Sequence, residues 1–99
     1  MLDLLLHDME ERLGTAGFKR VHEQEHPQAF GSREIVWAGP TGVLRLVWDG
    51  KESWIILEAR PSNGINWEEL RLEKVRRDGL DENGRKVLIQ ALDTWLSSS

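Results

Sequence analysis

The sequence predicts an α+β fold: an antiparallel sheet of four or five strands, in meander order, with two helices packed on one face. Three observations predict it. An amphipathic segment stands near each end of the chain, at residues 2–16 and 81–96. Between them lie short apolar runs separated by turn residues. The length of 99 residues suits one domain. We therefore expect a two-layer sandwich over residues 1–96 and a disordered tail at 97–99.

Both terminal segments carry apolar residues at helical spacing. In the first segment these are Leu2, Leu5, Leu6, Met9, Leu13 and Ala16, and in the last they are Leu88, Ala91, Leu92, Trp95 and Leu96. Gly17 follows the first stripe and is expected to cap that helix at its C-terminus. Each stripe needs a sheet or a second helix to cover it.

The strands are expected between these helices. Residues 18–26 are mostly polar and suit a sheet edge, where charge discourages pairing with other chains. Residues 32–38 form the second strand, and residues 43–59 form a hairpin of two more. Residues 65–77 fit either a helix or an outer strand, of which we favour the strand. Trp67 is assigned to neither face.

The pair Asp49-Gly50 predicts the register of the hairpin, because Asp-Gly is typical of a two-residue type I′ turn. The turn would pair Trp48 with Lys51, Val47 with Glu52, Leu46 with Ser53, Arg45 with Trp54, Leu44 with Ile55 and Val43 with Ile56. A four-residue loop at 39–42 would set Trp37 opposite Leu44 and Ile35 opposite Leu46. Alternation then assigns one face to the core: Ile35, Trp37, Leu44, Leu46, Trp48, Ile55, Leu57 and Ala59.

The opposite face is unusually apolar for a solvated sheet surface. It holds Glu34, Val36, Ala38, Val43, Arg45, Val47, Glu52, Trp54, Ile56, Glu58 and Arg60. Trp and Arg are enriched at the energetic centres of protein interfaces. We therefore predict a protein-binding surface, for a second copy or another protein, made of Val36, Val43, Arg45, Val47, Trp54, Ile56 and Glu58. An ordinary sheet surface is the other interpretation, in which Arg45 stacked on an exposed Trp54 would be a simple cross-strand pair.

Tryptophan is frequent in this chain, with five residues. Trp37, Trp48 and Trp95 fall on core-facing positions, so we interpret them as packing residues. A small-molecule pocket lined by these three residues is the alternative.

Charge and composition limit the partners that we expect. The net charge is −4, and acidic residues interrupt even the densest basic segment, 71–77. Nucleic acid is not expected, because phosphate neutralisation requires a concentrated basic surface. No apolar run approaches the roughly 20 residues of a membrane span, so no membrane association is expected. The sequence has no cysteine, which fits the cytoplasm.

One motif suggests an enzyme. Residues 22–26 read H-E-Q-E-H, which resembles the H-E-x-x-H signature of the zincin metalloproteases. The resemblance implies zinc ligands at His22 and His26 and a general base at Glu23. That chemistry needs a helix, since a strand separates residues i and i+4 by roughly 13 Å, and Pro27 follows directly. We expect no metal, cofactor or catalytic activity, with a zinc-dependent hydrolase as the alternative.

Overall fold

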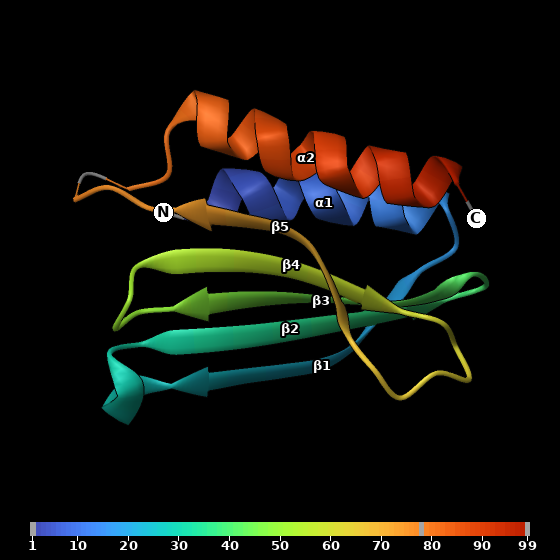
Figure 1. Cartoon of the computed structure of the whole chain (residues 1–99), viewed down its shortest axis with the longest axis horizontal. Helices are drawn as coiled ribbons and strands as arrows, with labels where there is room; N and C mark the ends of the chain where they lie inside the picture. Colours follow the sequence, from blue (N-terminus) through green and yellow to red (C-terminus); the bar gives the residue numbers. More distant parts are fainter. Residues whose placement is uncertain (1, 78, 99) are drawn as a thin grey trace.

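A computed structural model describes residues 2–77 and 79–98 and contains two helices and one five-stranded sheet (Figure 1). The elements are α1 (Asp3–Thr15), β1 (Lys19–His26), the 3-10 turn η1 (Pro27–Ala29), β2 (Ser32–Gly39), β3 (Gly42–Asp49), β4 (Trp54–Arg60), β5 (Glu68–Lys74) and α2 (Glu82–Ser97). The sheet is antiparallel throughout and its order is β1-β2-β3-β4-β5. The predicted meander is confirmed, and the ambiguous segment supplies its fifth strand.

Both helices pack on the same face of the sheet, as expected. They run in the same direction, because five strands of alternating direction lie between them in the chain (Figure 1). The predicted core face is confirmed: Ile35, Trp37, Leu44, Leu46, Ile55, Leu57 and Ala59 are buried, and Trp48 packs half-buried against them. The helices cover this face with Leu5, Leu6, Met9, Leu13, Leu88, Ile89 and Leu92.

The end of α1 explains how the chain turns from helix into strand. Gly17 has a left-handed backbone (φ 86°) and donates its N–H to the carbonyl of Gly14, while Phe18 donates to the carbonyl of Leu13 at 2.8 Å. These two bonds form a Schellman motif, and its usual apolar contact is possible because Leu13 and Phe18 are both buried. The predicted cap at Gly17 is therefore confirmed.

The final helix begins at an Asp N-cap. The Oδ1 atom of Asp81 accepts a hydrogen bond from the backbone N–H of Gly84 at 2.7 Å, which satisfies one of the free amides of the first turn. At the other end Ser97 is the last helical residue and Ser98 is the C-cap. Of the predicted tail, Ser99 lies outside the described residues.

The predicted turn of the central hairpin is wrong. Asp49 pairs with Trp54, so residues 50–53 form a four-residue turn. The Oδ1 atom of Asp49 organises it by accepting the backbone N–H groups of Lys51 and Glu52 at 3.0 and 3.1 Å. The left-handed residue is Ser53 (φ 59°) rather than Gly50.

The predicted strand pairs of this hairpin change accordingly, by four residues. The observed pairs are Val43 with Arg60, Leu44 with Ala59, Arg45 with Glu58, Leu46 with Leu57, Val47 with Ile56 and Trp48 with Ile55. Because side chains alternate with period two, a shift of four leaves every strand residue on its predicted face. Glu52 is the exception, since it lies in the turn.

The register between β2 and β3 agrees with the prediction. Trp37 lies opposite Leu44 and Ile35 opposite Leu46, although the connecting turn is shorter than expected because Gly39 already pairs with Gly42. Among the described residues, neither helix is long and apolar enough to cross a membrane.

Candidate functional site

We call the sheet face opposite the two helices the open face. The seven residues predicted as a protein-binding surface all point to it: Val36, Val43, Arg45, Val47, Trp54, Ile56 and Glu58. Val43 is buried and the other six are half-buried. The structure thus brings the predicted set together on one surface, which no helix of the described residues covers.

An apolar band crosses the open face. Val47 of β3, Ile56 of β4 and Leu72 of β5 are direct cross-strand neighbours and form one row. Trp54 lies two residues from Ile56 on β4, and Val36 borders the band on β2. Leu72 was not in the predicted set, because its face depends on the pairing of β5 with β4. The row of direct neighbours therefore spans three strands; on β2 the residue opposite Val47 is Glu34, and Val36 lies diagonal to Val47.

Arg45 and Glu58 form an ion pair near the middle of this face. The Nε and Nη2 atoms of Arg45 lie 2.9 and 2.8 Å from Oε1 of Glu58. The guanidinium of Arg45 also stacks on the ring of Trp67, 4.1 Å from its centroid. The predicted cross-strand pair of Arg45 with Trp54 is wrong, because the longer turn moves Trp54 opposite Asp49.

The loop of residues 61–67 holds Trp67 in this position. Figure 1 shows the connection from β4 to β5 folding across the front of the sheet. Arg60 anchors it: one Nη1 hydrogen bond reaches the carbonyl of Gly64 at 2.9 Å, and the guanidinium lies 5.0 Å from the Trp67 centroid. Trp67 thus lies over part of the open face, where it contacts Arg45 and Arg60 through cation–π interactions. The position of Trp67 could not be predicted from the sequence, since the loop of residues 61–67 has no periodic pattern of apolar residues.

Trp54 is less exposed than expected. Its side chain is half-buried, and its Nε1 atom is enclosed with no hydrogen-bond partner among the described residues. The ammonium of Lys74 lies 5.9 Å from its ring centroid. The ring therefore contributes apolar area to the open face but leaves one buried donor unsatisfied.

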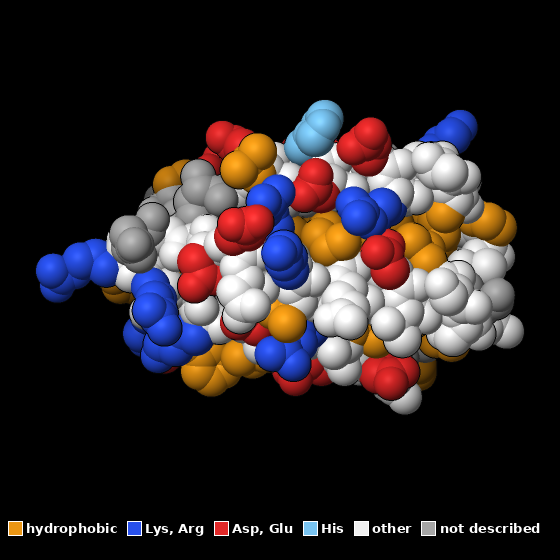
Figure 2. All heavy atoms as spheres, turned by 90° about the horizontal axis from the view of Figure 1, so that it is seen from above, with side chains coloured by type: hydrophobic (Ala, Val, Ile, Leu, Met, Phe, Trp, Pro, Cys, Tyr) orange, Lys and Arg blue, Asp and Glu red, His pale blue; other side chains and the backbone are white. Residues whose placement is uncertain are grey.

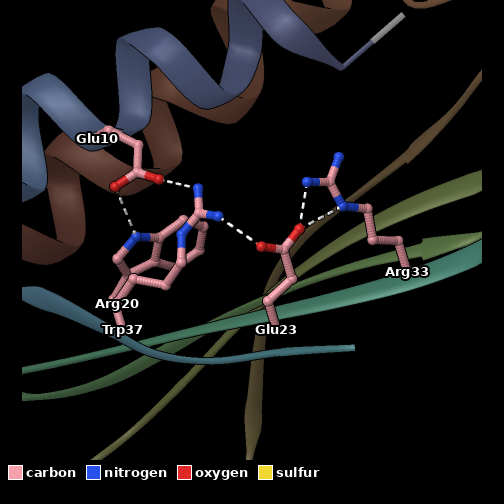
Figure 3. A network of polar contacts seen from close by, with 5 residues as sticks. All are labelled: Glu10, Arg20, Glu23, Arg33 and Trp37. Atoms are coloured by element: carbon pink, nitrogen blue, oxygen red, sulfur yellow. Dashed lines mark hydrogen bonds and ion pairs between the residues drawn. The ribbon is translucent and has the colours of Figure 1, made fainter. Parts of the chain in front are cut away.

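The edge strand β1 carries charged side chains that point to the helix side of the sheet (Figure 3). Glu23 accepts hydrogen bonds from Nη1 of Arg20 at 2.7 Å and from Nε of Arg33 at 2.9 Å. Arg20 also pairs with Glu10 of α1, and Glu10 accepts the indole N–H of Trp37 at 3.1 Å. The network joins α1, β1 and β2.

The contacts of this network shift the pKa values of two of its residues, Glu23 and Arg20. Hydrogen bonding from Arg33 lowers the pKa of Glu23; desolvation opposes this shift, and the charges of Arg33 and Arg20 reinforce it. Burial by itself would lower the pKa of Arg20, but the hydrogen bonds and charges of Glu10 and Glu23 outweigh it and raise the pKa. Both groups are therefore held in their charged forms.

Both sheet edges are protected against pairing with another chain. β1 is exposed along its whole length, has a register shift between Arg20 and His22, and carries inward-pointing charges. β5 has a second register shift, opposite the Leu57–Glu58 step of β4, and a charged sequence. Bulges and inward charges are the usual devices that blunt sheet edges. The open face is thus better suited to association than either edge.

The H-E-Q-E-H segment does not form the zincin arrangement. It lies in β1 and is extended, so His22 and His26 are not one helical turn apart. Glu23 points to the opposite face and is engaged by two arginines. Within residues 2–77 and 79–98, no group of three or more potential ligands could hold a metal ion.

The three tryptophans predicted to face the core, Trp37, Trp48 and Trp95, all make packing contacts. Trp37 is 1% exposed, Trp48 packs against the core, and Trp95 contacts Phe18 edge-to-face with 5.7 Å between ring centroids.

Among the described residues, the outer surface of the two helices has no apolar row like that of the open face. Figure 2 shows basic and acidic side chains interleaved there, with apolar side chains between them.

The chain matches no known family model, no curated protein and no solved structure. The function of the open face is therefore inferred from its own residues and geometry.

Proposed function

We propose that this protein is a protein-interaction module whose open face binds its own copy or another protein. One observation carries the proposal. Among the described residues no helix covers this face of the five-stranded sheet, yet the face presents an apolar row of Val47, Ile56 and Leu72 across three strands, with Val36 diagonal to it. A solvated face of an antiparallel sheet is normally mostly polar.

The physical driving force would be burial of this band, at about 25 cal/mol for each Å² of apolar surface removed from water. The central charged pair lowers the cost of this burial, although removing its two charges from water still costs free energy. Arg45 and Glu58 are already paired, and Trp67 covers the guanidinium, so docking would strand neither charge. Trp and Arg beside an apolar centre are also typical of energetically important interface residues.

The H-E-Q-E-H motif that suggested a zinc-dependent hydrolase lies in a strand, where it does not form the zincin arrangement. The expected cytoplasmic location, and the expectation that nucleic acids and membranes are not partners, stay predictions.

Site-specific photo-cross-linking in the native cell tests the proposal. We expect p-benzoylphenylalanine at position 47, on the open face, to give one defined protein adduct that mass spectrometry identifies. The matched control places the same group at position 4 on α1, where the native Leu4 is 65% exposed. Equal products from both positions, or none from position 47, would refute the proposed function.

A further inference from the structure

We infer that the partner of the open face is a second copy of this chain, docked face to face. This inference rests on the proposed function, since it assumes that the open face binds protein. It is carried by the charges of that face and by its size.

Charged residues on the open face are balanced. The register places four basic and four acidic side chains there: Lys19, Arg45, Arg60 and Lys74 against Glu34, Asp49, Glu58 and Glu69. With histidines neutral, the face has no net charge, whereas the whole chain has −4. The entire excess of negative charge therefore belongs to the rest of the protein.

This balance favours self-association through the open face. A surface that selects a strongly charged partner carries an excess of the opposite sign. In a symmetric dimer the same patch occurs on both subunits, so it must complement itself and needs both signs. Contact through the rest of the molecule would instead bring two acidic surfaces together. The open face is a region where two copies can meet without net repulsion.

The size of the face indicates how strong the dimer should be. Five strands of seven or eight residues, about 4.8 Å apart and at about 3.3 Å per residue, give a sheet face of roughly 600 Å², part of which the loop of residues 61–67 covers. Two such faces, with their loops, bury at most roughly 1,200 Å², the lower end of specific interfaces. The core of each subunit is complete without a partner, since Leu44, Ile55 and Leu57 are all 0% exposed. We therefore expect folded monomers in reversible equilibrium with dimers, with a dissociation constant on the order of micromolar.

A charge-exchange experiment tests this inference. One double variant, Lys19→Glu with Lys74→Glu, makes the face acidic; the other, Glu34→Lys with Glu69→Lys, makes it basic. We expect the wild type to dimerise in sedimentation velocity over a concentration series. Each double variant alone should associate at least ~10-fold more weakly, because like charges face each other. An equimolar mixture of the two should recover the wild-type sedimentation as a heterodimer.

Apolar variants provide an independent measurement and its control. Ile56→Lys, in the apolar band, should leave the protein monomeric, whereas Leu4→Lys on α1 should sediment like the wild type. Circular dichroism of every variant establishes that it is folded before its association is measured.

The outcomes separate this inference from the proposed function. A wild type that stays monomeric, while position 47 cross-links to a different protein, would overturn the second-copy inference and leave the proposed function standing. A monomeric wild type with no cross-link would overturn both. A dimer unaffected by Ile56→Lys, or two monomeric double variants that do not associate when mixed, would show that the face-to-face arrangement is wrong.

Discussion

At the scale of single residues, Trp37 and Trp54 illustrate how the same side chain can have opposite energetic consequences. The Nε1 atom of Trp37 is satisfied by Glu10, whereas that of Trp54 is enclosed without a partner among the described residues. A buried hydrogen-bonding group without a partner costs about 1–3 kcal/mol. The open face therefore contains one unsatisfied buried donor, at Trp54, whereas the donor of the core residue Trp37 is satisfied.

This contrast gives a matched pair of substitutions. Trp54→Phe removes the unsatisfied donor, so we expect the free energy of unfolding to stay the same or to rise by up to about 1 kcal/mol. Trp37→Phe removes a satisfied donor and buried side-chain volume, and should lower the free energy of unfolding by about 1–3 kcal/mol. Urea unfolding followed by circular dichroism measures both values. A larger loss for Trp54→Phe than for Trp37→Phe would contradict this interpretation of the two indoles.

Gly50 shows why the turn could not be predicted. The Asp-Gly pair was interpreted through the left-handed backbone that glycine tolerates, but glycine is needed at position 50 for space. A Cβ there would clash with the backbone carbonyl oxygen of Phe30, which is distant in sequence. The turn is instead closed by the side chain of Asp49 and by Ser53. A local pattern contains no information on that tertiary contact.

At the scale of elements, β1 was predicted correctly as a polar edge strand, but its charge network was not. Strict alternation would put Arg20 and Glu23 on opposite faces of the sheet. The register shift between Arg20 and His22 brings Arg20 and Glu23 to the helix side of the sheet. There Arg20 pairs with Glu10, and Glu23 accepts hydrogen bonds from Arg20 and Arg33. A bulge of one residue leaves no clear signal in a sequence that is charged on both faces.

The network predicts a pH dependence of stability. The pKa of Glu23 is lower in the folded protein than the ordinary value near 4.3. Its stabilising contribution is therefore complete above that ordinary value and is lost as the pH falls through the lowered pKa. We expect Glu23→Gln to reduce the difference between urea midpoints measured at pH 7 and at pH 3. Glu52→Gln, in the exposed turn of residues 50–53 and remote from the network, is the control, and an equal effect from both would contradict the assignment.

At the scale of the whole molecule, the fold prediction depended only on whether the error in the strand register was an even or an odd number of residues. The predicted pairs of the β3–β4 hairpin were wrong by four residues, yet Leu44 and Ile55 still share the buried face, because an even shift preserves alternation. The apolar pattern therefore predicted the two layers and the open face. It could not predict Trp67, whose position depends on how a loop without periodicity folds back.

The shared core predicts that helices and sheet unfold together. Leu92 of α2 is 0% exposed and belongs to the same cluster as the sheet residues Trp37 and Leu57. We expect Leu92→Ala to lower the free energy of unfolding by about 2–5 kcal/mol. Tryptophan fluorescence and helical circular dichroism should shift to the same new urea midpoint, because two-state unfolding gives coincident transitions.

Leu4→Ala is the matched control for this experiment, since Leu4 is 65% exposed on α1 and should change the stability by less than about 0.5 kcal/mol. Two separate transitions in the Leu92→Ala protein, with the helical signal lost before the fluorescence change, would show that α2 is a peripheral addition to an independently stable sheet. Coincident transitions would instead show that the sheet needs both helices, and hence that its open face exists only in the intact chain.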